Sequence, residues 1–184
     1  MKPPSLVDRL LAVCNVLERA GIPYAVGGAL ALAYYAEPRA TQDIDLNIFL
    51  PEGDGELVFE ALGDLGLRAT PEQRRRVAAE GQVRLDLDGT MLDLFFAGLP
   101  FHEQCRERAR QVPFDGGAIR VLSAEDLVVF KVLFNRTKDW TDISAVLSGT
   151  RIDTGYVLGW LDEMVGRDDT ARRRFATLAA SEAD

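Results

Sequence analysis

Cysteine and histidine are scarce in this sequence: 184 residues include two cysteines, Cys14 and Cys105, and one histidine, His102. The cysteines lie far apart, each within a helix-like pattern, and there is no CxxC pair. A zinc site built from Cys and His, or a disulfide framework, is therefore unsupported. Reduced, buried thiols are typical of a cytoplasmic protein, so we expect that location. A Ser/His/Asp hydrolase is also poorly supported, because no nucleophile elbow lies near His102.

Long apolar runs and net positive charge are also absent. Pro3-Pro4 and an amphipathic segment stand where a signal peptide would have its apolar region. The Ala-rich run from Ala29 to Ala36 is too short to span a bilayer, so no membrane association is expected. The net charge of −8 argues against a surface devoted to nucleic acid. It leaves room for a local basic patch and would suit a cationic small substrate.

What is present is the composition of an ordinary globular protein, 47% hydrophobic and 27% charged, able to bury a core. The pattern predicts an α+β fold, with a small mixed sheet flanked by helices and then a helical C-terminal region. We place the break near Leu122-Ser123, which divides the chain into 1–122 and 123–184. Predicted helices cover 5–20, 29–36, 57–65, 71–80, 102–110, 123–134, 140–147, 156–165 and 170–180. Predicted strands cover 22–28 and 43–50, a hairpin over 82–97 that turns at Asp88-Gly89, and a hairpin or extended element over 112–122.

Aspartates stand out within the predicted strands. Asp43 and Asp45 are two residues apart and therefore project from the same face, with Ile44 pointing the other way. Two close carboxylates repel each other unless a cation such as Mg²⁺ lies between them. Asp93 sits in an otherwise apolar strand, where a buried carboxylate needs a partner. If the strands are neighbours, the three acids converge as two-metal phosphoryl chemistry requires. The alternative for the pair is an ordinary solvent-facing D-x-D.

Glycine and basic residues supply further candidates. Gly27-Gly28 falls where a strand passes into a helix, which suits the close approach of a phosphate or simply a tight turn. Lys131 interrupts the apolar run "LVVFKVLF", so it either extends to the surface or faces phosphates or carboxylates. Arg39 would pair with an acid or guide a phosphate, and Thr41 would orient the loop before Asp43; for both residues a structural role is the commoner one.

Together these motifs resemble the nucleotidyltransferase superfamily: Gly-Gly after a strand, then "RATQDIDLNI", a lone strand aspartate, and a lysine followed by "NRTKDWTDI". The sequence is most similar to the small bacterial AbiEii-like toxin-type members, with the aminoglycoside and lincosamide nucleotidyltransferases as cousins. The resemblance covers roughly Tyr24 to Leu147. It implies a polymerase-β-like catalytic core over 1–122. One departure is that the second glycine is not the serine of the commonest superfamily motif.

The resemblance also implies roles and a reaction. Asp43, Asp45 and Asp93 would hold two Mg²⁺ ions, with Asp93 also a candidate general base. Six residues would bind the nucleoside triphosphate (NTP, for example ATP). These are Gly27, Gly28, Arg39, Thr41, Lys131 and Lys138. The enzyme would transfer a nucleoside monophosphate (NMP) from the NTP to an acceptor hydroxyl and release pyrophosphate.

The acceptor stays open at this point. A toxin-type enzyme would modify tRNA or a protein, with a cognate antitoxin as partner and with Arg74-Arg75-Arg76 and Arg172-Arg173-Arg174 as phosphate contacts. Consecutive arginines more often form a solvated helix face. An aminoglycoside-type enzyme would take a small cationic molecule, which suits the acidic balance and Asp86, Asp88 and Glu80. The third hypothesis is a catalytically silent nucleotide-binding module.

Overall fold

The protein is described here by a computed structural model over residues 3–182. Its chain forms two compact units. The first unit contains the described residues up to Gly28 together with Ala40–Val121, and the second contains Ala29–Arg39 and the described residues from Leu122 onward. The switch at Val121 lies one residue from the predicted break. Residues 29–39, by contrast, fold with the second unit although they lie inside the predicted first domain.

Helices and strands alternate through the first unit and give way to helices in the second. In chain order the elements up to the second strand are α1 (Leu6–Arg19), β1 (Tyr24–Val26), α2 (Gly28–Leu32) and β2 (Asp43–Pro51). They are followed by the short 3₁₀ helix η1 (Glu52–Asp54), α3 (Gly55–Gly63), α4 (Pro71–Glu80), β3 (Gln82–Leu87), β4 (Thr90–Ala97), α5 (Pro100–Arg108), β5 (Arg110–Phe114) and β6 (Gly117–Val121). The remaining elements are α6 (Ala124–Phe134), α7 (Thr137–Gly149), α8 (Thr154–Met164) and α9 (Thr170–Ser181).

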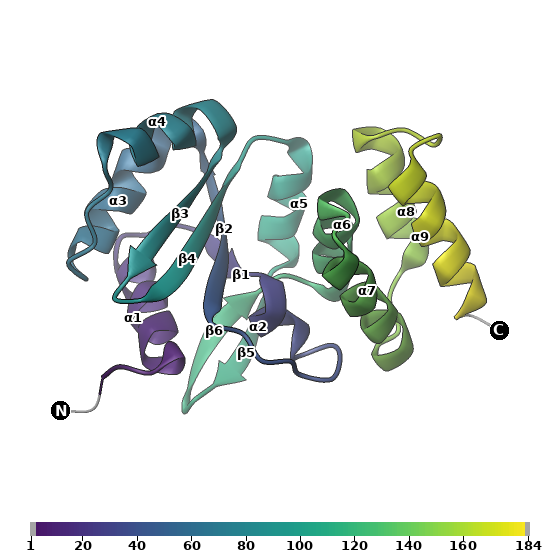
Figure 1. Ribbon diagram of the computed structural model, residues 1–184, viewed down its shortest axis with the longest axis horizontal. Coiled ribbons are helices and arrows are strands. Elements are labelled where there is room, and N and C mark those ends of the chain that lie inside the picture. Colours follow the sequence, from purple (N-terminus) through teal and green to yellow (C-terminus); the bar gives the residue numbers. More distant parts are fainter. Residues whose placement is uncertain (1–2, 183–184) are drawn as a thin grey trace. The chain divides into compact units, whose positions relative to one another are not determined.

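A mixed sheet of six strands in the order β3-β4-β2-β1-β6-β5 is the centre of the first unit (Figure 1). β2 runs parallel to β4 and antiparallel to β1, while β1 runs parallel to β6. Alternation along β2 buries Ile44, Leu46 and Ile48 completely on one face. On β4, Phe96 points to the side where α3 lies, close to Gly55. The α+β fold class with a small mixed sheet is thereby confirmed.

Turn and cap residues set the element boundaries where the sequence indicated them. The hairpin between β3 and β4 turns at Asp88 and Gly89, which have φ of 50° and 85°. The hairpin between β5 and β6 turns in the same way at Asp115 and Gly116. Ser123 caps α6 by accepting a hydrogen bond from the Asp126 amide. Both hairpins and this cap are confirmed.

One predicted helix is shorter than expected. The helix expected over 29–36 is α2 and ends at Leu32. The amides of Tyr34 and Tyr35 bond three residues back, to Ala31 and Leu32, although the Ala36 amide still bonds four residues back, to Leu32. This tighter geometry converts the last predicted turn of helix into hydrogen-bonded turns before Pro38.

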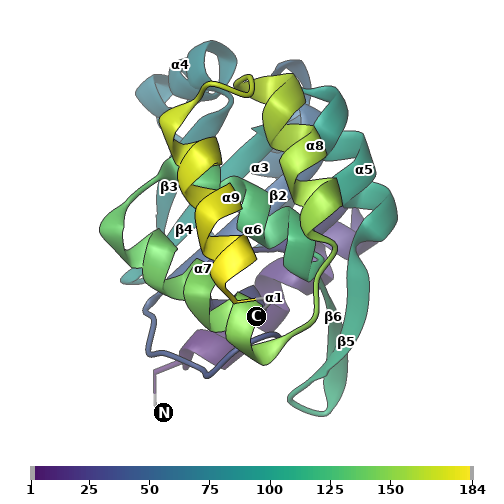
Figure 2. The same cartoon turned by 90° about the vertical axis from the view of Figure 1, so that its right-hand side faces the viewer.

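In the second unit, α8 packs against both α6 and α9 (Figure 2). Phe175 of α9 and Leu161 of α8 are completely buried there. The segment 29–39 joins this unit through Tyr35, whose hydroxyl donates to the Leu122 carbonyl at 2.6 Å and whose carbonyl accepts from Thr150. The helical C-terminal region is therefore confirmed, with an N-proximal segment added to it.

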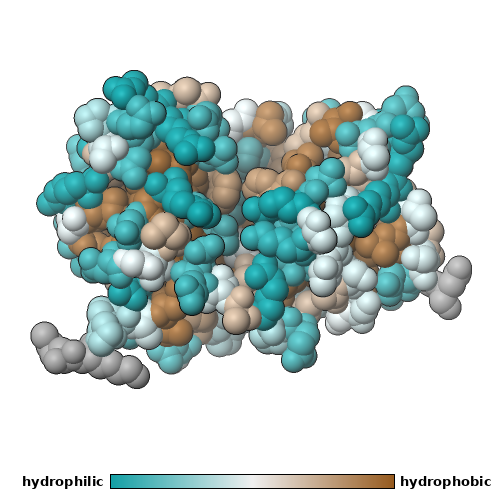
Figure 3. All heavy atoms as spheres, in the orientation of Figure 1, coloured by the Kyte–Doolittle hydropathy of each residue, from teal (hydrophilic) through white to brown (hydrophobic). Residues whose placement is uncertain are grey.

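Hydrophilic side chains cover much of the molecule in the view of Figure 3, including the region of α4. Over residues 3–182, no helix combines the length and the apolar character that crossing a membrane would need.

Candidate active site

The three predicted aspartates lie on one face of neighbouring strands. Asp43 and Asp45 are half-buried on β2 and alternate with the fully buried Ile44 and Leu46. On β4, Asp93 is half-buried between Leu92 and Leu94. Because β2 and β4 pair in parallel with Asp45 opposite Asp93, all three aspartates project to the same side. We call this side of β3, β4 and β2 the aspartate face.

Gly28 lies directly against this face. Its φ is +54°, in the left-handed region that favours glycine, and a Cβ atom built on it would stand 1.9 Å from an Asp45 carboxylate oxygen. Both facts require glycine here. The predicted change from strand to helix at the glycine pair is confirmed, since β1 ends at Val26 and α2 begins at Gly28.

The neighbouring backbone is held in place by two further residues. The Gly27 amide donates to the Asp45 carbonyl at 2.8 Å, which commits that amide to the protein's own backbone. The Thr41 hydroxyl accepts from the Asp43 amide at 3.2 Å and closes the loop onto the start of β2. Thr41 therefore orients the loop before the aspartates.

Arg84, which the sequence reasoning passed over, holds Asp93. Its Nε donates to one carboxylate oxygen of Asp93 at 2.7 Å, and its second guanidinium nitrogen donates to the other at 2.6 Å. The pKa of Arg84 is raised, first by the hydrogen bond and charge of Asp93 and then by the charges of Asp43 and Asp45. The sequence does indicate this pairing. In the hairpin, Leu87 on β3 lies opposite Thr90 on β4, so Arg84, three residues before Leu87, lies opposite Asp93, three residues after Thr90.

The donor set suits Mg²⁺ in chemistry, because carboxylate oxygens are the ligands that this ion prefers. The arrangement is not that of a preformed site: over residues 3–182, no three His, Cys, Asp or Glu side chains are placed so that together they could hold a metal ion. Arg84 binds both carboxylate oxygens of Asp93, so these oxygens are already occupied. Asp43 and Asp45 would be joined by Asp93 in a metal site only once Arg84 had released it.

Lys131 and Arg39 are found in the second unit, where both bind Asp142. The Lys131 ammonium group donates to Asp142 at 2.6 Å, and the two side chains are 5% and 4% exposed. Arg39 donates to both oxygens of Asp142 at 3.0 Å. Burial by itself would raise the pKa of Asp142, but hydrogen bonds from Arg39 and Lys131 lower it below its ordinary value. The sequence allowed Lys131 either to extend to the surface or to face phosphates or carboxylates, and in the structure it faces carboxylates.

The rest of the "NRTKDWTDI" signature forms the start of α7. Asp139 is completely buried and accepts from the Arg136 amide at 3.1 Å and from its guanidinium group at 2.7 Å, which caps the helix. Its other oxygen is 3.8 Å from the Lys131 ammonium nitrogen. Lys138 is exposed on the first turn of α7.

The arginine triplets bind the protein's own acids. On α4, Arg74 pairs with Glu56, Arg75 with Glu72 and Arg76 with Glu80. Near α9, Arg172 pairs with Asp162 and Arg173 with Asp168, while the Arg174 guanidinium carbon lies 4.1 Å from the centre of the Trp140 ring. This is the solvated-face arrangement, with most of the charge compensated within the chain.

The scarce residues behave as expected. Cys14 and Cys105 are buried and not disulfide-bonded, and burial raises the pKa of Cys14 to about 11. His102 accepts from the Leu99 amide through Nδ1 at 3.1 Å and so serves the start of α5. Burial lowers its pKa.

The model of a family described as "Uncharacterised nucleotidyltransferase" matches residues 4–161. The chain belongs to this nucleotidyltransferase family. It is therefore an enzyme of the nucleotidyltransferase kind, which confirms the superfamily resemblance. No curated protein is significantly similar to it in sequence.

Solved nucleotidyltransferase structures share the fold. ANT(2″)-Ia in complex with adenylyl-2″-tobramycin has a TM-score of 0.61 at 15% identity, over 93% of this chain and 97% of that one. The lincomycin-bound lincosamide antibiotic adenylyltransferase LnuA has a TM-score of 0.53 at 16% identity, over 77% and 96%. An antigenic nucleotidyltransferase-like protein from Paracoccidioides brasiliensis has a TM-score of 0.50 at 15% identity, over 97% and 89%. At such identities the similarity is one of fold.

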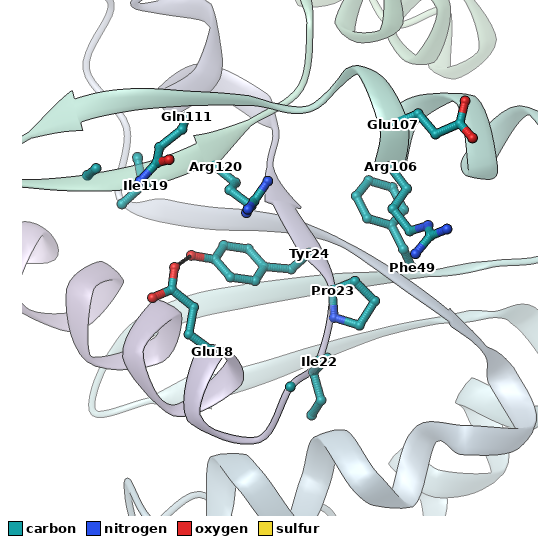
Figure 4. Close-up of a pocket in the computed structure, with 12 residues that line it drawn as sticks. Glu18, Ile22, Pro23, Tyr24, Phe49, Arg106, Glu107, Gln111, Ile119 and Arg120 are labelled. Atoms are coloured by element: carbon teal, nitrogen blue, oxygen red, sulfur yellow. Dashed lines mark hydrogen bonds between the residues drawn. The ribbon is translucent and has the colours of Figure 1, made fainter.

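The nucleotidyltransferase also has a cavity of about 600 Å³ in the first unit that is lined by none of the predicted site residues. In Figure 4, Glu18 of α1 and Tyr24 of β1 face each other at this cavity, with Arg120 of β6 nearby. The Tyr24 hydroxyl donates to Glu18 at 2.9 Å. Arg106, also in the lining, is held by Glu103.

Proposed function

We propose that this nucleotidyltransferase is Mg²⁺-dependent and transfers an NMP from an NTP to a hydroxyl group of an acceptor, with release of pyrophosphate. The observation that carries the proposal is the aspartate face, where Asp43, Asp45 and Asp93 come from adjacent strands in register. Asp43, Asp45 and Asp93 would hold the metal, two ions in all. When bound, Mg²⁺ would neutralise charge on the phosphates and on the leaving pyrophosphate.

The chain's own groups would then position the reactants. The acceptor oxygen forms a bond to the α-phosphorus, the bond from that phosphorus to the bridging oxygen of pyrophosphate breaks, and the acceptor's proton passes to a base. Asp93 is our candidate for that base. Gly28 supports a role beside the triphosphate because no side chain stands between its backbone and Asp45. Such a mechanism depends on positioning and on charge neutralisation.

The predicted nucleotide-binding residues differ in how well the structure supports them. Thr41 acts through the loop that leads to Asp43. Lys138 is exposed at the start of α7, and we retain it as a proposed contact of the nucleotide. Lys131 and Arg39 are bound to Asp142, so we propose that they act in holding α6, α7 and the segment 29–39 together.

For the acceptor we favour a small cationic molecule bearing a hydroxyl group. Asp86 lies on the same side of β3 as Arg84, which adds a fourth acid to the aspartate face. The arginines of α4 that would contact RNA are paired with glutamates. The aminoglycoside and lincosamide enzymes that share this fold support the same class. An RNA or protein acceptor, with the toxin role and an antitoxin that would accompany it, is the alternative outcome of the test.

The test is transfer of label from each NTP carrying ³²P at the α-position, with Mg²⁺ and with acceptors supplied in parallel. The acceptors are an aminoglycoside and lincosamide panel, bulk tRNA and a protein lysate. We expect labelled small molecules, and label in tRNA or protein would redirect the acceptor assignment. Asp43→Ala and Asp45→Ala should abolish transfer, whereas Asp115→Asn, in the turn between β5 and β6, should leave it unchanged. Transfer at the wild-type rate by the first two variants would contradict the proposal, and nucleotide binding without transfer to any acceptor would indicate a silent module.

A further inference from the structure

Arg84 is a cationic side chain on the aspartate face. It extends from β3 directly across from Asp93, its partner in the antiparallel register. The side chain of Arg84 is 57% exposed, whereas that of Asp93 is 14% exposed. The acid is thus held by its surroundings, while the arginine reaches it from the solvent side.

The guanidinium group of Arg84 binds the Asp93 carboxylate in a bidentate way. Both oxygens of the carboxylate accept hydrogen bonds from the guanidinium group, at 2.7 and 2.6 Å. Bidentate arginine–carboxylate pairs are among the stronger charge-assisted hydrogen bonds. A divalent ion that takes Asp93 as a ligand needs the same oxygens, so the ion and the guanidinium group compete for them.

The position of Arg84 also lets it respond to the other two acids. In the register of the sheet, Arg84, Asp93 and Asp45 form one row across β3, β4 and β2. The charges of Asp43 and Asp45 act on Arg84 in addition to that of Asp93. The positive charge of Arg84 therefore offsets part of the repulsion among the three aspartates when no metal ion is bound.

We propose that Arg84 is a tethered counter-ion that occupies Asp93 until a divalent cation displaces it, and so sets the affinity of the site for the metal. This inference rests on the proposed function only in taking Asp93 as a metal ligand. Because more than half of the Arg84 side chain is exposed, it can leave Asp93 for solvent without opening the core. Arg84 is in this sense a positioning residue, which acts on the metal through Asp93.

A static role predicts something different. If the pair only fastened β3 to β4, removing it would lower stability by the small amount expected for a partly exposed ion pair and would leave the affinity for metal unchanged. Metal affinity measured without nucleotide is therefore the deciding quantity.

The experiment is titration of the full chain with Mn²⁺, as a probe for Mg²⁺, followed by electron paramagnetic resonance of free Mn²⁺ and by calorimetry. We expect Arg84→Gln to bind Mn²⁺ about tenfold more tightly than the wild type, because a bidentate charge-assisted pair no longer has to be broken. Arg84→Lys keeps the charge but loses the bidentate hydrogen bonds, so its Mn²⁺ affinity should lie between those of the wild type and Arg84→Gln. Arg76→Gln removes the same charge from a surface pair with Glu80 and should leave the affinity unchanged.

Two further variants separate the possible failures. In an Asp93→Asn background, Arg84→Gln should bring a much smaller gain, because the shared carboxylate is gone and only the charge of Arg84 near Asp43 and Asp45 is removed. Asp45→Asn should weaken Mn²⁺ binding whatever stands at residue 84. Equal affinities of the wild type and Arg84→Gln, together with a loss in Asp45→Asn, would overturn the inference while leaving the proposed metal site intact. Absence of Mn²⁺ binding in every folded variant would overturn both.

Discussion

Two pairs of neighbouring elements in this nucleotidyltransferase, one in each unit, hold aspartates in different surroundings. In the first unit, Asp43, Asp45 and Asp93 are half-buried on one face of the sheet, and Arg84 binds Asp93. In the second unit, Asp139 and Asp142 are fully buried and bound by three cations, and these are Lys131, Arg39 and Arg136. Asp139 and Asp142 are each bound by basic side chains within the fold, while on the aspartate face Arg84 binds Asp93.

The difference teaches how to tell a structural acid from a functional one. Buried charges are tolerated when they are paired and hydrogen-bonded, and breaking such a pair destabilises the fold. Carboxylates gathered on one face of a sheet repel each other, and a divalent cation bound among them relieves that repulsion. Substitution should therefore act mainly on activity at the aspartate face and mainly on stability at the buried Asp139 and Asp142.

The largest expected effect is on activity in the first unit. Asp45→Asn should reduce NMP transfer by about a thousandfold or more, because a bound metal ion supplies several kcal/mol of transition-state stabilisation. The melting temperature should change little, since the amide has the shape of the carboxylate and removes a repelling charge. Circular dichroism and the α-³²P transfer assay measure the two quantities. A variant that unfolds readily, or that keeps its activity, would break the comparison.

The next effect is on stability in the second unit. Asp142→Asn should lower the free energy of unfolding by about 3 kcal/mol, because Lys131 would keep its charge in a buried place after losing its 2.6 Å partner. Urea denaturation measures this change. Asp64→Asn removes an exposed partner of Arg19 and is the matched control, expected to change stability by less than about 0.5 kcal/mol. Equal effects of the two substitutions would remove the distinction drawn between them.

The stability contributed by Asp142 should also depend on pH. The pKa of Asp142 is lower in the folded protein than its ordinary value of 3.8, so its ionised form contributes stability that is present above that value. This contribution is lost as the pH falls below 3.8 toward the pKa of the folded state. The wild type should therefore lose stability more steeply below about pH 4 than Asp142→Asn does. Parallel curves of unfolding free energy against pH would contradict the pairing described here.

A smaller effect is expected at the glycine beside Asp45. Gly28→Ala should cost about 1–3 kcal/mol, the range for a non-glycine residue held at positive φ, with the clash against Asp45 in addition. It should also reduce transfer, because Asp45 would have to move. Gly21→Ala, at φ +67° with nothing near the added Cβ, is the control for the backbone term alone. If both variants had equal activity, the close approach of Gly28 to Asp45 would have no functional meaning.

Much of the first unit could be predicted from the sequence because local rules determine it. Alternation put Asp43 and Asp45 on one face, and Asp88-Gly89 gave the hairpin. That hairpin even contains the pairing of Arg84 with Asp93, which register counting would have revealed. The partners of Lys131 could not be predicted, since Asp142 reaches it only through the packing of α7 on α6. The same holds for the segment 29–39, whose membership of the second unit depends on hydrogen bonds across more than eighty residues of sequence.

That segment has a consequence for dissecting the protein. Residues 29–39 sit between β1 and β2 in the chain but fold with the helices that follow Val121. A fragment truncated at Val121 would retain every aspartate of the aspartate face and still leave Tyr35 without Leu122 and Thr150, and Arg39 without Asp142. The stretch that joins Gly28 to Asp43 would then have lost these three contacts, so we expect such a fragment to hold that stretch less firmly than the whole chain does.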